Sequence, residues 1–88
     1  MVLRNLVSWI VPLSRFQDFY HGEEVADMVP VIWELSWGDT LQWEVGGCLT
    51  GLAVVVSCEE EIEIVEDKKD GTEILKHPMV GVVFRRIS

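Results

Sequence analysis

The sequence has few basic residues and no long apolar segment. Seven Lys and Arg stand against 15 Asp and Glu, which gives a net charge of -8. Because surfaces that bind phosphate backbones are rich in Lys and Arg, this balance disfavours nucleic acid as a direct ligand. The apolar runs Leu6 to Leu13 and Leu49 to Val56 are much shorter than the ~20 residues that a membrane-spanning helix needs. We therefore predict no membrane segment and no signal peptide, and we expect a cytoplasmic protein.

Cysteine is also scarce. Cys48 and Cys58 would lie about 33 Å apart on one extended strand, which is far more than a disulfide spans unless the chain folds back between them. The sequence has no Cys-x-x-Cys motif and no cysteine and histidine spacing typical of zinc sites. His21 and His77 have no nucleophile or carboxylate at a spacing typical of catalysis. We therefore expect free thiols, no metal, no cofactor and no catalytic residue, which favours a protein that is not an enzyme.

Apolar residues, in contrast, are abundant. The 88 residues predict a single domain, 1–88, and a chain of this size buries roughly 60–65% of its unfolded surface. Yet 49% of the residues are hydrophobic and four are Trp. This is more apolar material than a small monomer easily hides, so we predict a self-associating face and a homo-oligomer.

The stretch Trp37 to Ser57 predicts a β-hairpin. A turn at Gly38-Asp39 leads into residues 41–45, where apolar and polar side chains alternate, and Gly46-Gly47 is typical of a two-residue hairpin loop. The second arm, Cys48 to Val56, is almost continuously apolar. This pattern predicts a strand at the centre of the sheet that is covered on both faces.

The segments before this hairpin predict a strand, a helix and a second strand. Met1 to Val11 favours an opening strand over a helix. Ser14 to Gln17 matches a capping box with Ser14 at the N-cap, so a short helix should begin there and end near His21 or Gly22. Val29 to Trp33 is β-branched and aromatic and is interpreted as an irregular edge strand, although a helix across Val29 to Leu35 is the alternative.

The segments after the hairpin predict two further strands. Glu59 to Glu66 alternates acidic and apolar residues, and Asp67 to Gly71 is a polar turn. His77-Pro78 should break the chain before the apolar strand Met79 to Phe84, a plausible neighbour of the central strand. Together these elements predict an α+β, mostly β fold, with a small, strongly bent antiparallel sheet or barrel of five to six strands and one short helix.

The order of these elements is similar to the ASCH family of PUA-like barrels. The resemblance is carried by the helix start at Ser14 to Asp18, by Gly22, and by the Gly38-Asp39 turn that leads into a β-meander, and it covers most of Val7 to Val56. It implies a cleft that binds RNA or, in some members, hydrolyses amides of modified nucleosides. The Gly-Asp turn also resembles the swapped-hairpin barrels of AbrB-type regulators.

The family motif of the cleft is Gly-x-Lys, followed by acidic and Arg residues. In this sequence Glu24 stands in the lysine position, Asp27 can stand for the acid, and the arginine position falls near Val29. The resemblance therefore implies a cleft formed by Arg15, Glu24 and Asp27, in which the motif's cations are replaced.

Two groups of residues are candidates for binding a protein partner. The acidic residues Glu59, Glu60, Glu61 and Glu63 could bind a basic protein, as an inhibitor or nucleic-acid mimic would, although charge on an edge strand also prevents edge-to-edge pairing. Trp37 and Trp43 could mark an interface, although tryptophans are also common in cores. We favour a non-enzymatic interaction module that self-associates, with an ASCH-like domain or an acidic inhibitor as alternatives.

Overall fold

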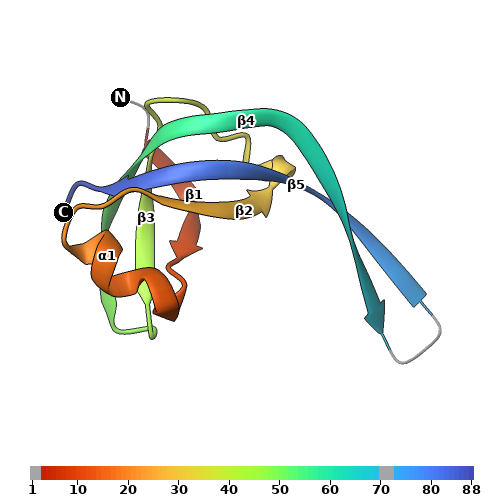
Figure 1. The fold of residues 1–88 in the computed structure, drawn as a ribbon, viewed down its shortest axis with the longest axis horizontal. Coiled ribbons are helices and arrows are strands. Elements are labelled where there is room, and N and C mark those ends of the chain that lie inside the picture. The colour runs from red at the N-terminus through yellow and green to blue at the C-terminus, as the bar shows by residue number, and fades with distance from the viewer. Residues whose placement is uncertain (1–2, 70–72) are drawn as a thin grey trace.

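The computed structural model describes the backbone of residues 3–69 and 73–88 and the side chains of residues 7–60 and 78–88. Its five-stranded sheet curls strongly into a half-barrel, and a short α-helix lies beside it (Figure 1). The α+β, mostly β prediction is therefore confirmed. The strands are β1 (Leu3–Ile10), β2 (Val25–Pro30), β3 (Thr40–Val45), β4 (Leu49–Lys69) and β5 (Glu73–Arg86); the helices are α1 (Phe16–Tyr20) and the short 3-10 helices η1 (Leu13–Arg15) and η2 (Val31–Trp33).

The sheet has the order β1-β3-β4-β5-β2, so β4 occupies the predicted central position. The predicted β3–β4 hairpin is also confirmed, but its loop has three residues rather than two, because Val45 pairs with Leu49. Gly46 and Gly47 have φ angles of 61° and 72°. Only glycine adopts this left-handed region without steric cost, which explains the glycine pair in the loop.

The opening strand is confirmed as β1, and it pairs with β3 in parallel. All the other strand pairs of the described sheet are antiparallel. Parallel neighbours need a long crossover connection. Here residues 11–39 supply it, and they include α1 and β2. Because of this crossover, β1 and β2 lie at opposite edges of the sheet.

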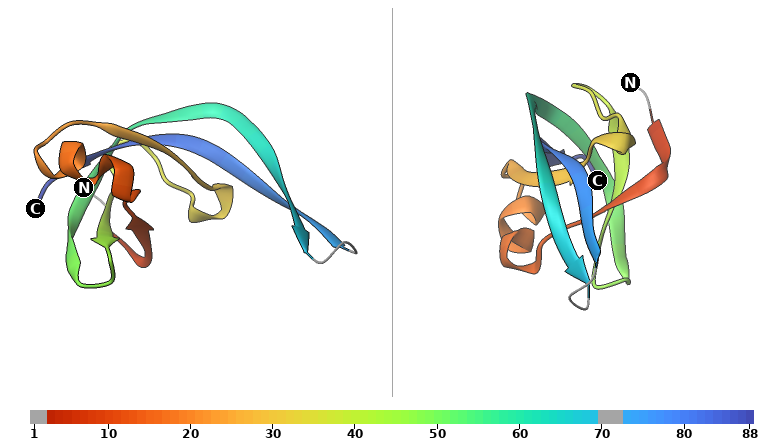
Figure 2. Two further views of the ribbon diagram at one scale, coloured as in Figure 1. Left: turned by 60° about the horizontal axis from the view of Figure 1, so that its bottom comes forward. Right: turned by 90° about the vertical axis from the view of Figure 1, so that its right-hand side faces the viewer.

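Beyond the body of the sheet, β4 and β5 continue as a two-stranded arm, formed by residues 62–69 and 73–80 (Figures 1 and 2). The predicted chain break at His77-Pro78 is wrong, because β5 runs through both residues. The pairing of β5 with β2 ends at Met79, so among the described strands only β4 pairs with β5 at Pro78. A proline fits such a position because one edge of the strand needs no N–H donor. The predicted turn Asp67 to Gly71 is wrong for residues 67–69, because β4 continues to Lys69. Residues 70–72 lie outside the described chain.

The arm leaves the body at a bulge in β4. Cys58 pairs with Val82 and Ile62 pairs with Val80, so three residues of β4, 59–61, face Gly81 alone. Such irregularities bend a strand and increase its twist. A Cβ atom on Gly81 would lie 2.7 Å from a carboxylate oxygen of Glu59, so the glycine leaves room for that side chain.

The helix α1 begins later than the capping box predicts. Ser14 lies inside η1, and the N-cap position of α1 is Arg15, which makes no side-chain capping hydrogen bond. The predicted capping box is therefore wrong. The reason is a tight turn directly after Pro12, closed by a hydrogen bond of 2.9 Å from Arg15 N to Pro12 O. The predicted end of the helix is confirmed, because His21 is its C-cap and Gly22 has a φ of 97°.

The predicted edge strand exists with different bounds. β2 is an edge strand but ends at Pro30, and residues 31–33 form η2 instead of the expected strand. A hydrogen bond of 2.9 Å from Glu34 N to Val31 O closes this turn. Pro30 precedes η2 directly, and its fixed φ suits the residue that leads into a helical turn.

Aromatic rings fill the inside of the half-barrel. Trp9 stacks on Phe84 with ring centroids 4.0 Å apart, and Phe19 presents ring edges or faces to both Trp9 and Trp43. Trp9 also donates a hydrogen bond of 2.9 Å from Nε1 to Asp27 Oδ2. Since Trp9 is on β1 and Asp27 is on β2, this bond links the two edge strands across the open side of the half-barrel.

The central strand is buried on one face only. Ala53 and Val55 are buried, whereas Leu52, which points to the opposite face, is 37% exposed. The expectation of full cover on both faces is therefore wrong for the first part of β4. The helix α1 lies on the inner side of the curled sheet, where its Phe19 belongs to the aromatic core (Figure 2). Within the same residues, no helix is long and apolar enough to cross a membrane.

Candidate interaction surface

Trp37 lies at the tip of a tight turn formed by residues 36–39. Asp39 N donates to Ser36 O at 3.0 Å, and Ser36 N donates to Asp39 Oδ2 at 2.9 Å. Gly38, the third residue, has a φ of 86°, as in a type II turn. The predicted Gly38-Asp39 turn is confirmed, and its two hydrogen bonds hold the backbone of Trp37 in one conformation.

The same turn is fastened to the central strand. Gly38 N donates to Val55 O at 2.9 Å, and Val55 N donates to Asp39 O at 2.8 Å. Val55 and Asp39 are both buried. The Trp37 side chain, however, is 79% exposed. A large aromatic side chain is thus presented to solvent from a backbone that the core of the sheet positions.

A small apolar groove lies at the base of the arm. It is lined by Pro30, Ile32, Pro78 and Met79, and its volume is about 290 Å³. Pro30 pairs with Met79 at the end of the β2–β5 ladder, and Ile32 follows in η2. Ile32 is 83% exposed. We call these four residues the apolar groove.

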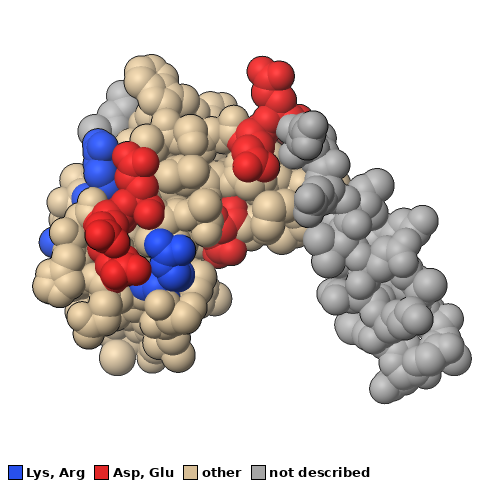
Figure 3. Space-filling model, viewed as in Figure 1, with Lys and Arg blue, Asp and Glu red and all other residues tan. Residues whose placement is uncertain are grey.

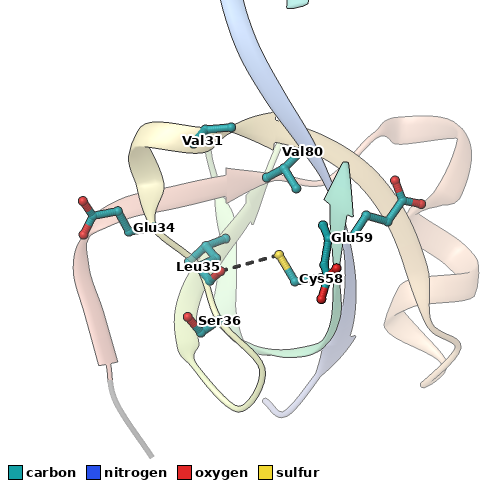
Figure 4. A pocket seen from close by; sticks show the side chains of 8 residues that line it. Val31, Glu34, Leu35, Ser36, Cys58, Glu59 and Val80 are labelled. Atoms are coloured by element: carbon teal, nitrogen blue, oxygen red, sulfur yellow. Dashed lines mark hydrogen bonds between the residues drawn. The ribbon is translucent and has the colours of Figure 1, made fainter. Parts of the chain in front are cut away.

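A second concavity has a volume of about 330 Å³ (Figure 4). Cys58 donates a weak hydrogen bond of 3.6 Å from Sγ to Leu35 O, and Figure 4 shows this thiol directed at Leu35. Two carboxylates from the β4 bulge and one from the end of η2 contribute to the lining. We call it the acidic groove; it is lined by Val31, Glu34, Leu35, Ser36, Cys58, Glu59, Glu60 and Val80.

The structure separates the two tryptophans that were candidates for an interface. Trp37 is on the surface, whereas Trp43 is 1% exposed and donates a hydrogen bond of 2.9 Å from Nε1 to Ser88 O. Trp43 is therefore a core residue in this chain. Trp9 is likewise buried, and Trp33 is half-buried against the core.

The acidic candidates fall partly within the described side chains. Glu59 and Glu60 are exposed at the bulge. Glu61 and Glu63 belong to β4, but their side chains lie outside the described part. On the face that Figure 3 shows, the basic side chains lie at the end of the molecule remote from the arm, whereas acidic ones lie both there and near the base of the arm.

The three residues that the ASCH resemblance implies for a cleft have separate partners. Arg15 pairs with Asp18 at 3.5 Å, Glu24 with Arg85 at 4.0 Å, and Asp27 accepts from Trp9. Neither groove described above includes any of them. Sequence reasoning missed Arg85 as the cation beside Glu24, because the two residues meet only through the folding of the sheet.

Among the described side chains, potential metal ligands and the two cysteine thiols do not form a cluster. Among residues 7–60 and 78–88, no cluster of three or more His, Cys, Asp and Glu side chains could hold a metal ion. Both cysteines are free, as expected: Cys48 is exposed in the hairpin loop and Cys58 is half-buried at the acidic groove.

No family model matches this sequence, and comparisons with curated proteins and with solved structures found no match either. The surfaces of the chain itself are therefore the basis for assigning a function. The most distinctive of them are apolar: the exposed side chains of Trp37 and Ile32, and the apolar groove that Ile32 lines. We refer to these residues together as the Trp37 face.

Proposed function

We propose that this chain is a non-enzymatic interaction module that self-associates through the Trp37 face. The observation that carries the proposal is the exposure of two large apolar side chains, Trp37 at 79% and Ile32 at 83%, the second of which lines the apolar groove. Exposed aromatic and aliphatic side chains on a positioned backbone are typical of protein interfaces, because little conformational entropy is lost when they are buried.

The total surface supports a second copy of the chain as the partner. The accessible surface is 6150 Å², whereas a compact monomer of 10.0 kDa exposes about 5200 Å². The radius of gyration, 13.8 Å, likewise exceeds the value of about 12 Å for a compact domain of this length. The arm is the part that departs from a compact shape, and the apolar groove lies at its base.

Replacement of Trp37 by Ser tests the proposal. A hot-spot residue contributes about 2–4 kcal/mol to binding. Since each 1.4 kcal/mol is tenfold in the dissociation constant, W37S should weaken self-association about 30- to 700-fold. Sedimentation equilibrium from 1 to several hundred micromolar measures this change.

Leu13→Ser is the matched control. Leu13 is also 79% exposed, but it lies in η1, away from the apolar groove. L13S should therefore associate like the unmodified chain. A chain that stays monomeric at all concentrations would refute the proposal, as would equal effects of W37S and L13S.

A second candidate function is the binding of a basic protein at the acidic groove. It is supported by the two exposed carboxylates of Glu59 and Glu60 in a concavity of about 330 Å³. Binding of an oligolysine peptide should then fall when both are changed to Gln, and Glu23→Gln, an exposed control elsewhere, should have no effect.

Salt distinguishes the two functions. Attraction between exposed opposite charges weakens with salt, because the screening length falls to about 10 Å at 0.1 M. Self-association of two chains of charge -8 should instead strengthen with salt. Peptide binding that persists at high salt or in the double Gln variant would contradict the acidic-groove function.

A further inference from the structure

We infer that Asp27 blocks strand addition at the free edge of β2, so that another strand can pair there only after the contacts of this one carboxylate are broken. β2 is the last strand of the sheet and pairs on one side only, with β5. An unpaired edge presents backbone N–H and C=O groups to which another chain can add a strand. The inference goes beyond the proposed self-association and does not depend on it.

Both oxygens of the Asp27 carboxylate accept hydrogen bonds at this edge. Met28 N donates to Oδ1 at 2.8 Å, and Trp9 Nε1 donates to Oδ2 at 2.9 Å. Trp9 is 1% exposed and belongs to β1, at the opposite edge of the sheet. The first bond occupies a backbone donor of β2. The second links the two edge strands across the open side of the half-barrel, where an added strand would have to enter.

The other positions of this edge offer few donors. Successive residues of an antiparallel strand direct their N–H and C=O groups to opposite sides, so residues 26, 28 and 30 share one direction. Because the Met28 N–H meets a side chain rather than β5, this direction is outward. Pro30 has no N–H. Within β2, Ala26 is thus the single residue whose outward N–H is neither bound by Asp27 nor missing.

The same carboxylate opposes pairing with the β2 edge of a second copy. In a twofold antiparallel pair, Ala26 of one copy would exchange hydrogen bonds with Met28 of the other, because a register that pairs residue 30 instead lacks a donor. This register places Asp27 of one copy directly opposite Asp27 of the other. Like charges in directly opposite positions destabilise a strand pair. Asp27 therefore blocks the edge both by binding a donor and by its charge.

Removal of the carboxylate tests the inference. In Asp27→Ala the Met28 N–H is released and the like charges are absent, so the β2 edges of two copies should pair. The double variant D27A/M28P is the matched control, because it also lacks Asp27 and keeps the Trp37 face, but the proline removes the donor at an edge position that tolerates it.

Sedimentation equilibrium should give D27A a dissociation constant that is lower by about tenfold or more than that of D27A/M28P, since a twofold pair contains two hydrogen bonds from Met28. Equal dissociation constants would overturn the inference. Lower stability of D27A without association that depends on Met28 would show that Asp27 only links β1 to β2.

Amide hydrogen exchange of the unmodified chain gives a test that needs no variant and remains available if circular dichroism shows that D27A is unfolded. The Met28 N–H is bound to Asp27, whereas the outward N–H of Ala26 lacks that acceptor. Measured by NMR and corrected for intrinsic rates, exchange at Met28 should be slower than at Ala26 by about tenfold or more. Exchange at Met28 as fast as at Ala26 would overturn the role of Asp27 at this edge.

Discussion

Replacing Gly51 by Ala should destabilise the fold through a single backbone contact. A Cβ atom at this position would lie 2.0 Å from the carbonyl oxygen of Ser88 and 2.7 Å from Nε1 of Trp43. The end of the chain would therefore have to move. Ser88 O accepts hydrogen bonds from Trp43 Nε1 at 2.9 Å and from Leu52 N at 3.2 Å, and Ser88 N donates to Leu52 O at 3.1 Å.

The magnitude follows from the buried indole. Trp43 is almost fully buried, so the loss of its acceptor costs about 1–3 kcal/mol, and the more exposed backbone hydrogen bonds of Ser88 add about 1 kcal/mol. The lower entropy of alanine in the unfolded chain offsets about 0.4–1 kcal/mol. The free energy of unfolding should thus fall by about 1–3 kcal/mol, a large share of the ~5–15 kcal/mol of a typical domain.

Gly81→Ala is the matched control, because it is also a glycine in a strand of the same sheet. Its added Cβ would meet the Glu59 carboxylate at 2.7 Å, but this group is the end of an exposed, flexible side chain that can rotate away. Urea unfolding followed by tryptophan fluorescence should show a clear loss of stability for G51A and a change within about 1 kcal/mol for G81A. Equal unfolding free energies for the two variants would refute the proposed clash with Ser88.

Two other contacts give further predictions. Asp27→Ala should lower the free energy of unfolding by about 1–3 kcal/mol, because the buried Trp9 indole loses its hydrogen-bond acceptor. Asp27→Asn keeps an oxygen acceptor and should cost less. Urea unfolding compares the two variants, and equal losses would contradict the role of this bond. Arg86→Ala should cost about 1–2 kcal/mol in thermal or urea unfolding, because Arg86 Nε donates to Tyr20 O at 2.9 Å and the guanidinium covers the Tyr20 ring. Arg85→Ala, which removes only an exposed ion pair of 4.0 Å, should cost less than about 1 kcal/mol, and the opposite order would count against this assignment.

The local features of the fold were predictable from the sequence. Gly46 and Gly47 between two apolar segments specify the β3–β4 hairpin, because turn chemistry and side-chain alternation act over a few residues. The same alternation places Trp43 on the buried face together with Leu41 and Val45, so its role in the core could have been inferred from that pattern. Trp37 lies outside the alternation, at the second position of a tight turn.

The non-local features were not predictable. The break was expected at Pro78 because proline has no N–H to donate to a neighbouring strand. Proline is nevertheless tolerated within β5 because the β2–β5 pairing has already ended at Met79, and the sequence alone does not reveal where that pairing ends. The parallel pairing of β1 with β3 depends on a crossover of almost thirty residues, for which no short motif exists. The apolar groove is formed by Pro30 and Ile32 together with Pro78 and Met79, which come together only in the folded sheet.

Because the arm leaves the sheet at the bulge of residues 59–61, a small change of the bend there produces a large displacement of the far end of the arm. Beyond it, residues 62–69 of β4 span about 23 Å at the ordinary rise of a strand. A change of about 10° in the bend at the bulge would therefore move the far end of this segment by about 4 Å. Since Gly81 is the single residue of β5 opposite the bulge, a substitution there could redirect the arm while the aromatic core stays in place. The direction of the arm could then change during evolution without a change in the stability of the fold.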